Sequence, residues 1–298
     1  MKILLLGKNG QLGWELQRSL AVLGEVVACG RAEADLENLA GLQAVVRKVS
    51  PQIIVNAAAY TAVDKAESEP ERSFLINSKA VELLAKEASI LNAWFIHYST
   101  DYVFDGTKNG PYQETDATHP LGIYGKTKLS GEEAIRASGC RHLILRTSWV
   151  YAARGNNFIK TMLRLAQERN EIKVVFDQIG APTSAELLAD VTACCLYRIQ
   201  YDASFADHQG GTYHLAAGGS TSWHGFAQFI LNEAFHHGVE LRVTSENVLA
   251  IPTSEYPLPA IRPANSQLAT EKITTSFDIK LPPWQLHAKR TVAEIVSR

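Results

Sequence analysis

The chain opens with ILLLGKNGQLG at residues 3–13, a short apolar run followed by three glycines. The spacing Gly-x-x-Gly-x-x-Gly is one residue wider than the familiar Gly-x-Gly-x-x-Gly of dinucleotide-binding folds. Glycines in such a turn allow close approach of a pyrophosphate to the backbone and close packing of the next helix, whose N-terminus attracts the anion. The stretch therefore predicts a dinucleotide site at Gly7, Gly10, Leu12 and Gly13, with a purely structural turn as the alternative.

Short apolar runs recur through the first half of the chain, at residues 3–7, 26–29, 53–58, 94–99 and 142–146. Their uninterrupted apolar character is typical of parallel strands that are covered on both faces. Helical patterns separate them, notably over residues 11–23 and 70–92, and the second pattern places Phe74 with Val81 and Leu84 on one buried side. This alternation predicts an α/β fold, with a Rossmann-type doubly wound parallel sheet over residues 1–150.

The pattern changes after about residue 150. Amphipathic helices are predicted at residues 157–167 and 185–199, and a short strand at 213–216. Ser222 is a predicted N-cap of a further helix, and the proline-rich residues 251–262 favour an irregular loop. We expect residues 151–298 to form mainly a smaller α/β substrate-binding domain, with elements around residues 180–216 returning to the main sheet.

Composition narrows the classes of function. The 298 residues are 46% hydrophobic and 20% charged with a net charge of −2, which is typical of a globular protein and argues against nucleic acid as a partner. Apolar runs of membrane-spanning length and a signal peptide are both missing from the sequence, which favours a cytoplasmic protein. The four cysteines include no Cys-x-x-Cys pair, so we expect reduced and mostly buried thiols.

The end of the second predicted strand bears on the choice of cofactor. A carboxylate there hydrogen-bonds the ribose 2′-hydroxyl of NADH, but the sequence has Gly30 and Arg31 at this point. Arg31 is suited to meet the 2′-phosphate of NADPH, although Glu33 and Asp35 follow closely. The sequence favours NADPH and leaves NADH open, and a solvated role for Arg31 is the alternative.

Three side chains form a candidate catalytic set. Tyr124 and Lys128 are four residues apart, so on a helix they share a face, and an ammonium beside a phenol lowers the pKa of the phenol. Thr100 ends the fourth apolar run, and the carboxyl end of a parallel strand is where open α/β sheets bind ligands. Its hydroxyl is placed to donate to a carbonyl oxygen that gains negative charge during hydride addition.

These elements, in this order, resemble the extended short-chain dehydrogenase/reductase family. Longer stretches resemble one group within it, the dTDP-4-dehydrorhamnose reductases: NAAAYTAVDK at residues 56–65, STDYVFDG at 99–106, RTSWVY at 146–151 and DQIGAPT at 177–183. The resemblance implies reduction of the 4-keto group of dTDP-4-dehydro-L-rhamnose to dTDP-L-rhamnose by NADPH or NADH. Hydride would reach C4 from the nicotinamide, Tyr124 would give the proton to the oxygen, and Thr100 would polarise that oxygen.

The resemblance also assigns binding residues. Cofactor-contacting positions match Asn9, Gly10, Gln11, Asp35, Leu36, Ala59, Tyr60 and Thr61, beside Arg31, Tyr124 and Lys128. Substrate-contacting positions match Thr100, Asp101 and Trp149, together with Tyr124. A tryptophan suits a sugar face or a thymine ring, and packing between domains is the alternative for Trp149.

Some members of the family are homodimers that hold Mg²⁺ through glutamates at the interface. The matching residues are Glu15, Glu186 and Glu294, each of which also suits a solvated helix surface. The resemblance thus implies a possible metal site and a homodimer, although hydride transfer to a ketone needs no metal.

Three other functions compete with reduction. A dehydratase of this fold usually has Asp-Glu after the threonine, whereas Thr100 is followed by Asp101 and Tyr102, which argues against dehydration. A nucleotide-sugar epimerase uses the same tyrosine–lysine pair and stays open. A non-catalytic, NADP-binding regulatory subunit has no need of the whole catalytic set, which argues against that function.

Overall fold

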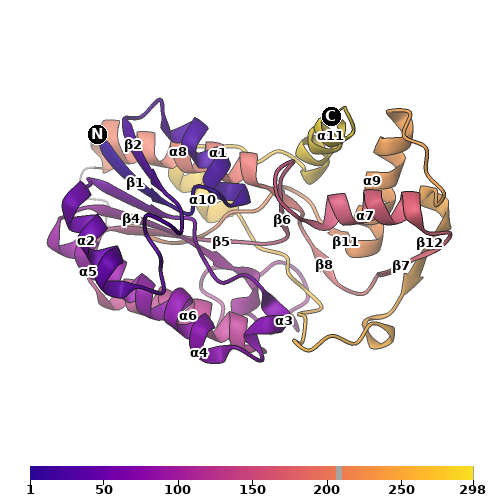
Figure 1. The fold of residues 1–298 in the computed structure, drawn as a ribbon, viewed down its shortest axis with the longest axis horizontal. Coiled ribbons are helices and arrows are strands. Elements are labelled where there is room, and N and C mark those ends of the chain that lie inside the picture. The colour runs from indigo at the N-terminus through magenta and orange to yellow at the C-terminus, as the bar shows by residue number, and fades with distance from the viewer. Residues whose placement is uncertain (206–209, 298) are drawn as a thin grey trace.

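A six-stranded parallel sheet organises the larger part of the molecule (Figure 1). The computed structural model describes residues 1–205 and 210–297. The sheet has the order β10-β5-β4-β3-β1-β2, so the direction of strand addition reverses between β1 and β3. Its strands are β1 Lys2–Leu6, β2 Glu25–Cys29, β3 Ile53–Asn56, β4 Trp94–Thr100, β5 His142–Thr147 and β10 Gly210–His214. The predicted Rossmann-type fold is confirmed.

Both faces of the sheet are buried. Alternate residues of each strand point to opposite sides, so each strand contributes side chains to both faces. Ile3 and Leu5 of β1 belong to one apolar cluster, whereas Leu4 and Leu6 belong to another. The first face is covered by α1 Gln11–Leu20 and α8 Ala185–Tyr201. The second is covered by α2 Leu39–Val49, α5 Ala80–Ile90 and α6 Ile123–Ala137. This burial on both sides explains why the strands are apolar without alternation.

The helix predicted over residues 70–92 is interrupted. It consists of α4 Pro70–Phe74, a π-helical turn at Leu75–Lys79, and α5. A π-helical turn takes one more residue than an α-helical turn, so it rotates the residues before it relative to those after it. The prediction that Phe74 joins the buried side is therefore wrong, because Phe74 is 40% exposed.

The rest of the chain forms a second lobe beside the sheet (Figure 1). Its two-stranded pairings join β7 Ile172–Val175 with β12 Val248–Ile251, and β8 Ile179–Gly180 with β11 Thr221–Ser222. Its main helices are α7 Phe158–Glu168, α9 Trp223–His236 and α11 Trp284–Val296. The strands β6 Val150–Tyr151 and β9 Thr183–Ser184 pair where the chain passes between the lobes, while α3 Val63–Ala66 and α10 Glu271–Phe277 are short helices of the sheet side.

Local predictions in this half are confirmed in part, because Ile251 of the predicted loop belongs to β12 and the predicted strand is shifted. The Ser222 hydroxyl accepts a hydrogen bond from the Gly225 amide at 2.9 Å, which confirms the predicted N-cap of α9. Residues 252–262 form a loop with one short 3-10 turn at Thr253–Glu255. The predicted strand at residues 213–216 starts earlier, as β10, and ends at His214.

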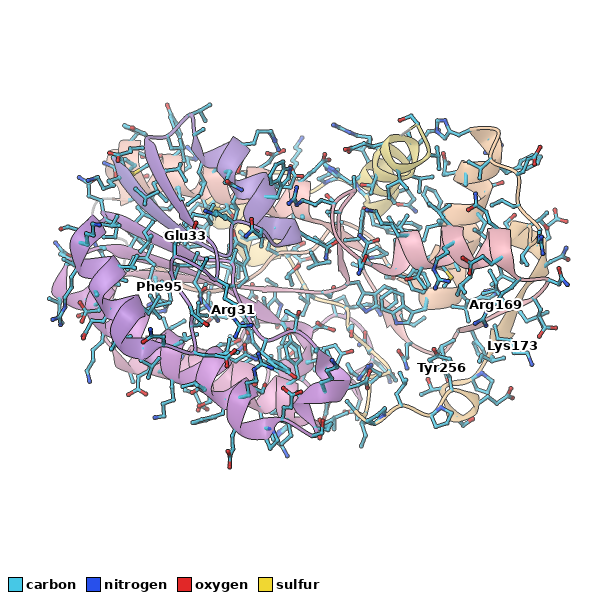
Figure 2. All side chains as sticks on the ribbon, in the orientation of Figure 1. Arg31, Glu33, Phe95, Arg169, Lys173 and Tyr256 are labelled. Atoms are coloured by element: carbon cyan, nitrogen blue, oxygen red, sulfur yellow. The ribbon has the colours of Figure 1, made fainter. Side chains whose placement is uncertain are left out.

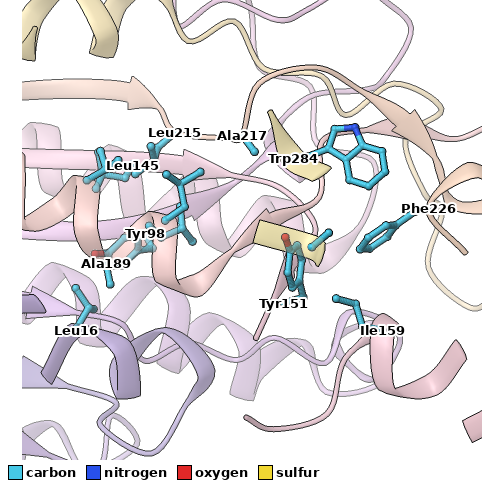
Figure 3. Packing of buried hydrophobic residues seen from close by; sticks show 14 of the residues in the cluster. Leu16, Tyr98, Leu145, Tyr151, Ile159, Ala189, Leu215, Ala217, Phe226 and Trp284 are labelled. Atoms are coloured by element: carbon cyan, nitrogen blue, oxygen red, sulfur yellow. The ribbon is translucent and has the colours of Figure 1, made fainter. Parts of the chain in front are cut away.

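One apolar cluster continues from the sheet into the second lobe (Figure 3). Leu16 and Tyr98 pack in the sheet half. Tyr151 contacts Phe226 of the second lobe, and Phe226 contacts Trp284. The two parts therefore share one apolar core. Cys29, Cys140 and Cys195 are buried and Cys194 is exposed, all as free thiols. Among the described residues, helices long and apolar enough to span a membrane are absent.

Candidate active site

The glycine stretch forms the tight turn between β1 and α1. Gly7 has a positive φ of 90°, and a β-carbon there would lie 2.9 Å from the backbone of Ala57. A β-carbon on Gly13 would lie 2.0 Å from the carbonyl oxygen of Gly7, so α1 can approach the turn only with glycine there. At Gly10 the corresponding distance is 3.4 Å, which is an ordinary contact. Gly7 and Gly13 thus serve the packing, while Gly10 keeps the N-terminus of α1 open to a ligand.

A cavity of about 710 Å³ runs past the carboxyl ends of the central strands, which is where open α/β sheets bind ligands. Its lining includes the predicted cofactor residues Gly7, Asn9, Gly10, Gln11, Leu12, Arg31, Asp35, Leu36, Ala59, Tyr60 and Thr61. It also includes the predicted catalytic and substrate residues Thr100, Asp101, Tyr124, Lys128 and Trp149. The fold therefore brings both predicted groups to one cavity, with Gly13 buried beneath the turn.

Thr100 and Asp101 sit together at the carboxyl end of β4. The Thr100 hydroxyl donates a hydrogen bond to Asp101 Oδ1 at 2.9 Å and accepts one from the Tyr102 amide at 3.2 Å. Asp101 is 3% exposed. Burial raises the pKa of Asp101 to about 6, against hydrogen bonds from Ser266 and Thr100 that favour the charged form. This carboxyl group therefore changes its protonation state close to neutral pH.

Tyr124 lies in the first turn of α6 and faces Thr100. Burial, reinforced by the neighbouring charge of Asp101, raises the pKa of the Tyr124 phenol, and a hydrogen bond with Thr100 opposes that shift. This differs from the sequence expectation that Lys128 lowers the pKa of Tyr124. Desolvation of Tyr124 dominates the shift in its pKa, and the Lys128 ammonium is hydrogen-bonded to the Tyr98 carbonyl.

Lys128 is fully buried, and its Nζ donates to the backbone carbonyl of Tyr98 at 2.6 Å. It also lies 3.1 Å from His97 Nε2, while Asn56 Nδ2 lies 3.3 Å from His97 Nδ1. Burial lowers the pKa of Lys128 to about 8. Burial, together with the lysine charge, lowers the pKa of His97 well below its ordinary value, so the imidazole is neutral. The Lys128 ammonium is thus held by the Tyr98 carbonyl of β4 and by the neutral imidazole of His97.

Trp149 combines a strained backbone with an aromatic stack. It has a positive φ of 49°, which is rare for a bulky residue. Its ring stacks on Trp223 of α9 with centroids 3.6 Å apart and planes 11° from parallel. Gly180 lies under the same ring, and a β-carbon there would lie 2.5 Å from it. Trp149 therefore lines the cavity and packs between the two lobes at once, so the two roles weighed from the sequence are compatible.

Residues 1–297 match the family model described as RmlD substrate binding domain. A dTDP-4-dehydrorhamnose reductase of Salmonella typhimurium is 54% identical, over 99% of this chain and 98% of its own length. The chain belongs to the dTDP-4-dehydrorhamnose reductase family. Another member, from Escherichia coli K12, is 52% identical with the same coverage of both chains.

Solved structures of family members share the whole architecture. The dTDP-4-dehydrorhamnose reductase of Bacillus anthracis, in complex with NADP, has a TM-score of 0.88 and 34% identity, covering 98% of this chain and 99% of its own. A UDP-glucose 4-epimerase of Thermus thermophilus in complex with NAD has a TM-score of 0.80 at 15% identity, covering 99% of each chain. At that identity the likeness to the epimerase concerns the fold alone.

The three glutamates implied for a metal lie outside the cavity, on α1, α8 and α11. Burial raises the pKa of Glu15, and the charges of Glu186 and Glu294 add to that rise, so the three carboxylates are near one another. Glu186 lies 3.5 Å from His287 Nδ1. In residues 1–205 and 210–297, no three His, Cys, Asp or Glu side chains are grouped to hold a metal ion.

Four residues that line the cavity or contact its lining were not predicted from the sequence. His97 touches Lys128, Trp223 supports Trp149, and Glu37 and Arg72 line the cavity beside Arg31. None of these lies in a motif with a recognisable spacing. A hint existed for Glu37, because it closes the acidic run that follows Arg31.

Proposed function

We propose that this chain is an NAD(P)H-dependent dTDP-4-dehydrorhamnose reductase, an oxidoreductase that reduces the 4-keto group of dTDP-4-dehydro-L-rhamnose to give dTDP-L-rhamnose. The observation that carries the proposal is the single cavity in which a dinucleotide turn meets Thr100, Tyr124 and Lys128. Full-length similarity to curated reductases supports the substrate. The product would serve the synthesis of rhamnose-containing polysaccharides.

The cavity fits a nicotinamide dinucleotide. Gly10 leaves the backbone accessible at the N-terminus of α1, where amides and the helix dipole favour a pyrophosphate. When bound, such a cofactor supplies the hydride. We assign its binding to Gly7, Asn9, Gly10, Gln11, Leu12, Gly13, Arg31, Asp35, Leu36, Ala59, Tyr60, Thr61, Tyr124 and Lys128. A relative from Bacillus anthracis was solved in complex with NADP, which supports NADPH as one of the cofactors.

Tyr124 is the proposed proton donor to the oxygen at C4. The raised pKa suits this role, because the phenol stays protonated at neutral pH until the reduced oxygen takes the proton. Thr100 is the proposed donor to the same oxygen, and it would turn its hydroxyl from Asp101 Oδ1 to do so. Lys128 would hold the ribose of the cofactor, and for it also to adjust the acidity of Tyr124 its ammonium must leave the Tyr98 carbonyl.

Asp101 and Trp149 are the proposed substrate contacts beyond the reacting group. Asp101 lies next to Thr100 with a carboxylate that can accept from sugar hydroxyls, and the Trp149 ring lines the cavity. We also assign residues 1–150 to cofactor binding, joined by β10 and α8, and residues 151–298 mainly to substrate binding.

A homodimer with Mg²⁺ at its interface is a further part of the proposal. Glu15, Glu186 and Glu294 of one chain do not form a metal site by themselves, so a second copy would have to complete it. Burial raises the pKa of Glu15 and the charges of Glu186 and Glu294 raise it further, which supports a cation beside the Glu15 carboxylate. We expect the dimer to weaken on addition of a chelator, measured by light scattering after size exclusion. An unchanged mass would contradict a metal-linked dimer.

Free thiols and a nicotinamide-dependent reaction support a cytoplasmic location.

The catalytic assignment is tested by spectrophotometry with dTDP-4-dehydro-L-rhamnose and each reduced cofactor. Consumption of one NADPH or NADH per keto sugar supports a reductase. Conversion without net consumption would indicate an epimerase, and cofactor binding without any conversion would indicate a regulatory subunit.

Tyr124→Phe tests the proton donor directly. Because general acid catalysis contributes about 10²–10⁴-fold, we expect kcat to fall by about that factor while the affinity for NADPH stays within about twofold. Steady-state kinetics and a fluorescence titration measure the two effects. Near-full activity in the variant would show that another group supplies the proton.

A further inference from the structure

Two arginines meet one carboxylate at the end of the cavity away from Tyr124. Arg31 follows β2, Arg72 lies on α4, and both line the cavity. Glu37 Oε1 accepts from Arg31 Nη2 at 2.6 Å, from Arg72 Nη2 at 2.9 Å and from Arg72 Nε at 3.1 Å. Glu37 thus holds together two guanidinium groups that come from separate segments of the chain. Figure 2 labels Arg31 on the sheet half of the molecule.

This cluster stands where the fold places the adenosine ribose. In a dinucleotide-binding sheet, the residue after the second strand faces the 2′ position of that ribose. Gly30 and Arg31 occupy this point, and both line the cavity with Glu37 and Arg72. The cluster is therefore placed to distinguish a 2′-hydroxyl from a 2′-phosphate.

Two further carboxylates contact the two arginines of this cluster. Arg31 Nε also donates to Asp35 at 3.2 Å, and Arg72 Nη1 donates to Glu69 at 3.1 Å. Two guanidinium groups thus share three carboxylates, those of Glu37, Asp35 and Glu69. Guanidinium groups bind phosphate in a bidentate manner, but here Glu37 occupies the donors that a phosphate needs. A 2′-hydroxyl can instead donate to a carboxylate of the cluster.

We propose that Arg72 and Arg31 together bind the 2′-phosphate of NADPH, and that Glu37 competes for the same guanidinium groups and so keeps NADH usable. NADPH displaces the Glu37 carboxylate from the arginines, whereas NADH leaves it in place. The inference rests on the proposed function only in requiring a nicotinamide dinucleotide in this cavity. It assigns Arg72 and Glu37 to cofactor discrimination.

The test is equilibrium binding of NADPH and NADH to the protein without sugar substrate, measured by fluorescence titration or calorimetry. Arg72→Gln should weaken NADPH about tenfold and NADH by less than about twofold, because it removes one charge-assisted partner of the phosphate. Glu37→Gln should strengthen NADPH about three- to tenfold and leave NADH unchanged or weaker. The side chains of Arg31, Arg72 and Glu37 are 65%, 42% and 28% exposed, so the preference for NADPH should also shrink as salt is raised.

Arg47→Gln is the matched control. Arg47 also gives its guanidinium to a glutamate, Glu87 at 2.8 Å, but it lies on α2 outside the cavity. It should leave both affinities unchanged, and thermal melting checks that each variant folds. Equal weakening of both cofactors by Arg72→Gln, or an unchanged affinity ratio in Glu37→Gln, would overturn the inference. A parent protein that binds neither cofactor would instead overturn the proposed function itself.

Discussion

Asp101 is a buried carboxyl group whose chemistry depends on its surroundings. Burial raises its pKa from 3.8 to about 6, so the folded protein binds this proton more tightly than the unfolded chain does. Its contribution to stability is therefore fully present below about pH 4 and is lost as the pH rises through about 6. Above that pH the folded protein carries a buried charge, which is consistent with a carboxylate kept for a ligand.

Asp101→Asn should stabilise the protein at neutral pH by on the order of 3 kcal/mol, because it removes the cost of that buried charge. Asparagine can still accept the hydrogen bond from Thr100. At pH 3.5 the aspartate is already protonated, so the advantage should disappear. Urea unfolding of both proteins at the two pH values measures the difference. An equal gain at both values would assign the effect to packing and not to ionisation.

At the scale of elements, the turn between β1 and α1 connects fold and chemistry. Strand β1, the turn and helix α1 all lie within the first twenty residues, and the three glycines of the turn have different surroundings. Gly13 is in contact with the turn itself, whereas Gly10 has room for a β-carbon. Substitution of Gly13 therefore tests packing, and substitution of Gly10 tests ligand binding.

Gly13→Ala should destabilise the protein by about 1–3 kcal/mol, because its β-carbon would lie 2.0 Å from the Gly7 carbonyl oxygen and force α1 away. Gly10→Ala should cost less than about 1 kcal/mol, since its φ of −73° suits alanine. It should nevertheless weaken NADPH about tenfold by blocking the approach of the pyrophosphate. Thermal unfolding and cofactor titration of both variants check this. Unimpaired cofactor binding by Gly10→Ala would contradict the assigned turn.

At the scale of the whole molecule, the two lobes meet at the cavity through Trp149. Its positive φ is a conformation that costs on the order of 1–3 kcal/mol and persists because the surroundings hold it. Trp223 of the second lobe supplies that support by stacking on the ring. The residues that line the cavity all come from residues 7–150, so the second lobe acts on the cavity through Trp223, which supports the Trp149 ring.

Trp223→Leu should raise the KM for the keto sugar about tenfold and leave NADPH binding unchanged, because Trp149 loses its stacking partner while the glycine turn is unaffected. Phe229→Leu is the matched control, since Phe229 lies on the same helix and packs against Trp284 with ring centroids 4.8 Å apart. Steady-state kinetics with both variants measure the effect. A rise in KM of equal size in the control would indicate a general loosening of the second lobe.

Much of the molecule follows from the sequence alone. The apolar strands, the glycine turn, the Ser222 cap and the helical spacing of Tyr124 and Lys128 all depend on residues a few positions apart. Backbone propensity, hydrogen bonding and side-chain periodicity act over that range, so the order of residues determines them. The fold class and the position of the cavity at the strand ends follow from these features.

Only the tertiary structure decided which remote side chains meet. Arg72 and Glu37 are 35 residues apart, and Lys128 and His97 are 31 apart, so no local spacing indicated either contact. The π-helical turn that exposes Phe74 depends likewise on how α4 and α5 pack against their neighbours. Desolvation of Tyr124 and Asp101 arises only when distant segments close over them, and their pKa values therefore belong to the folded molecule.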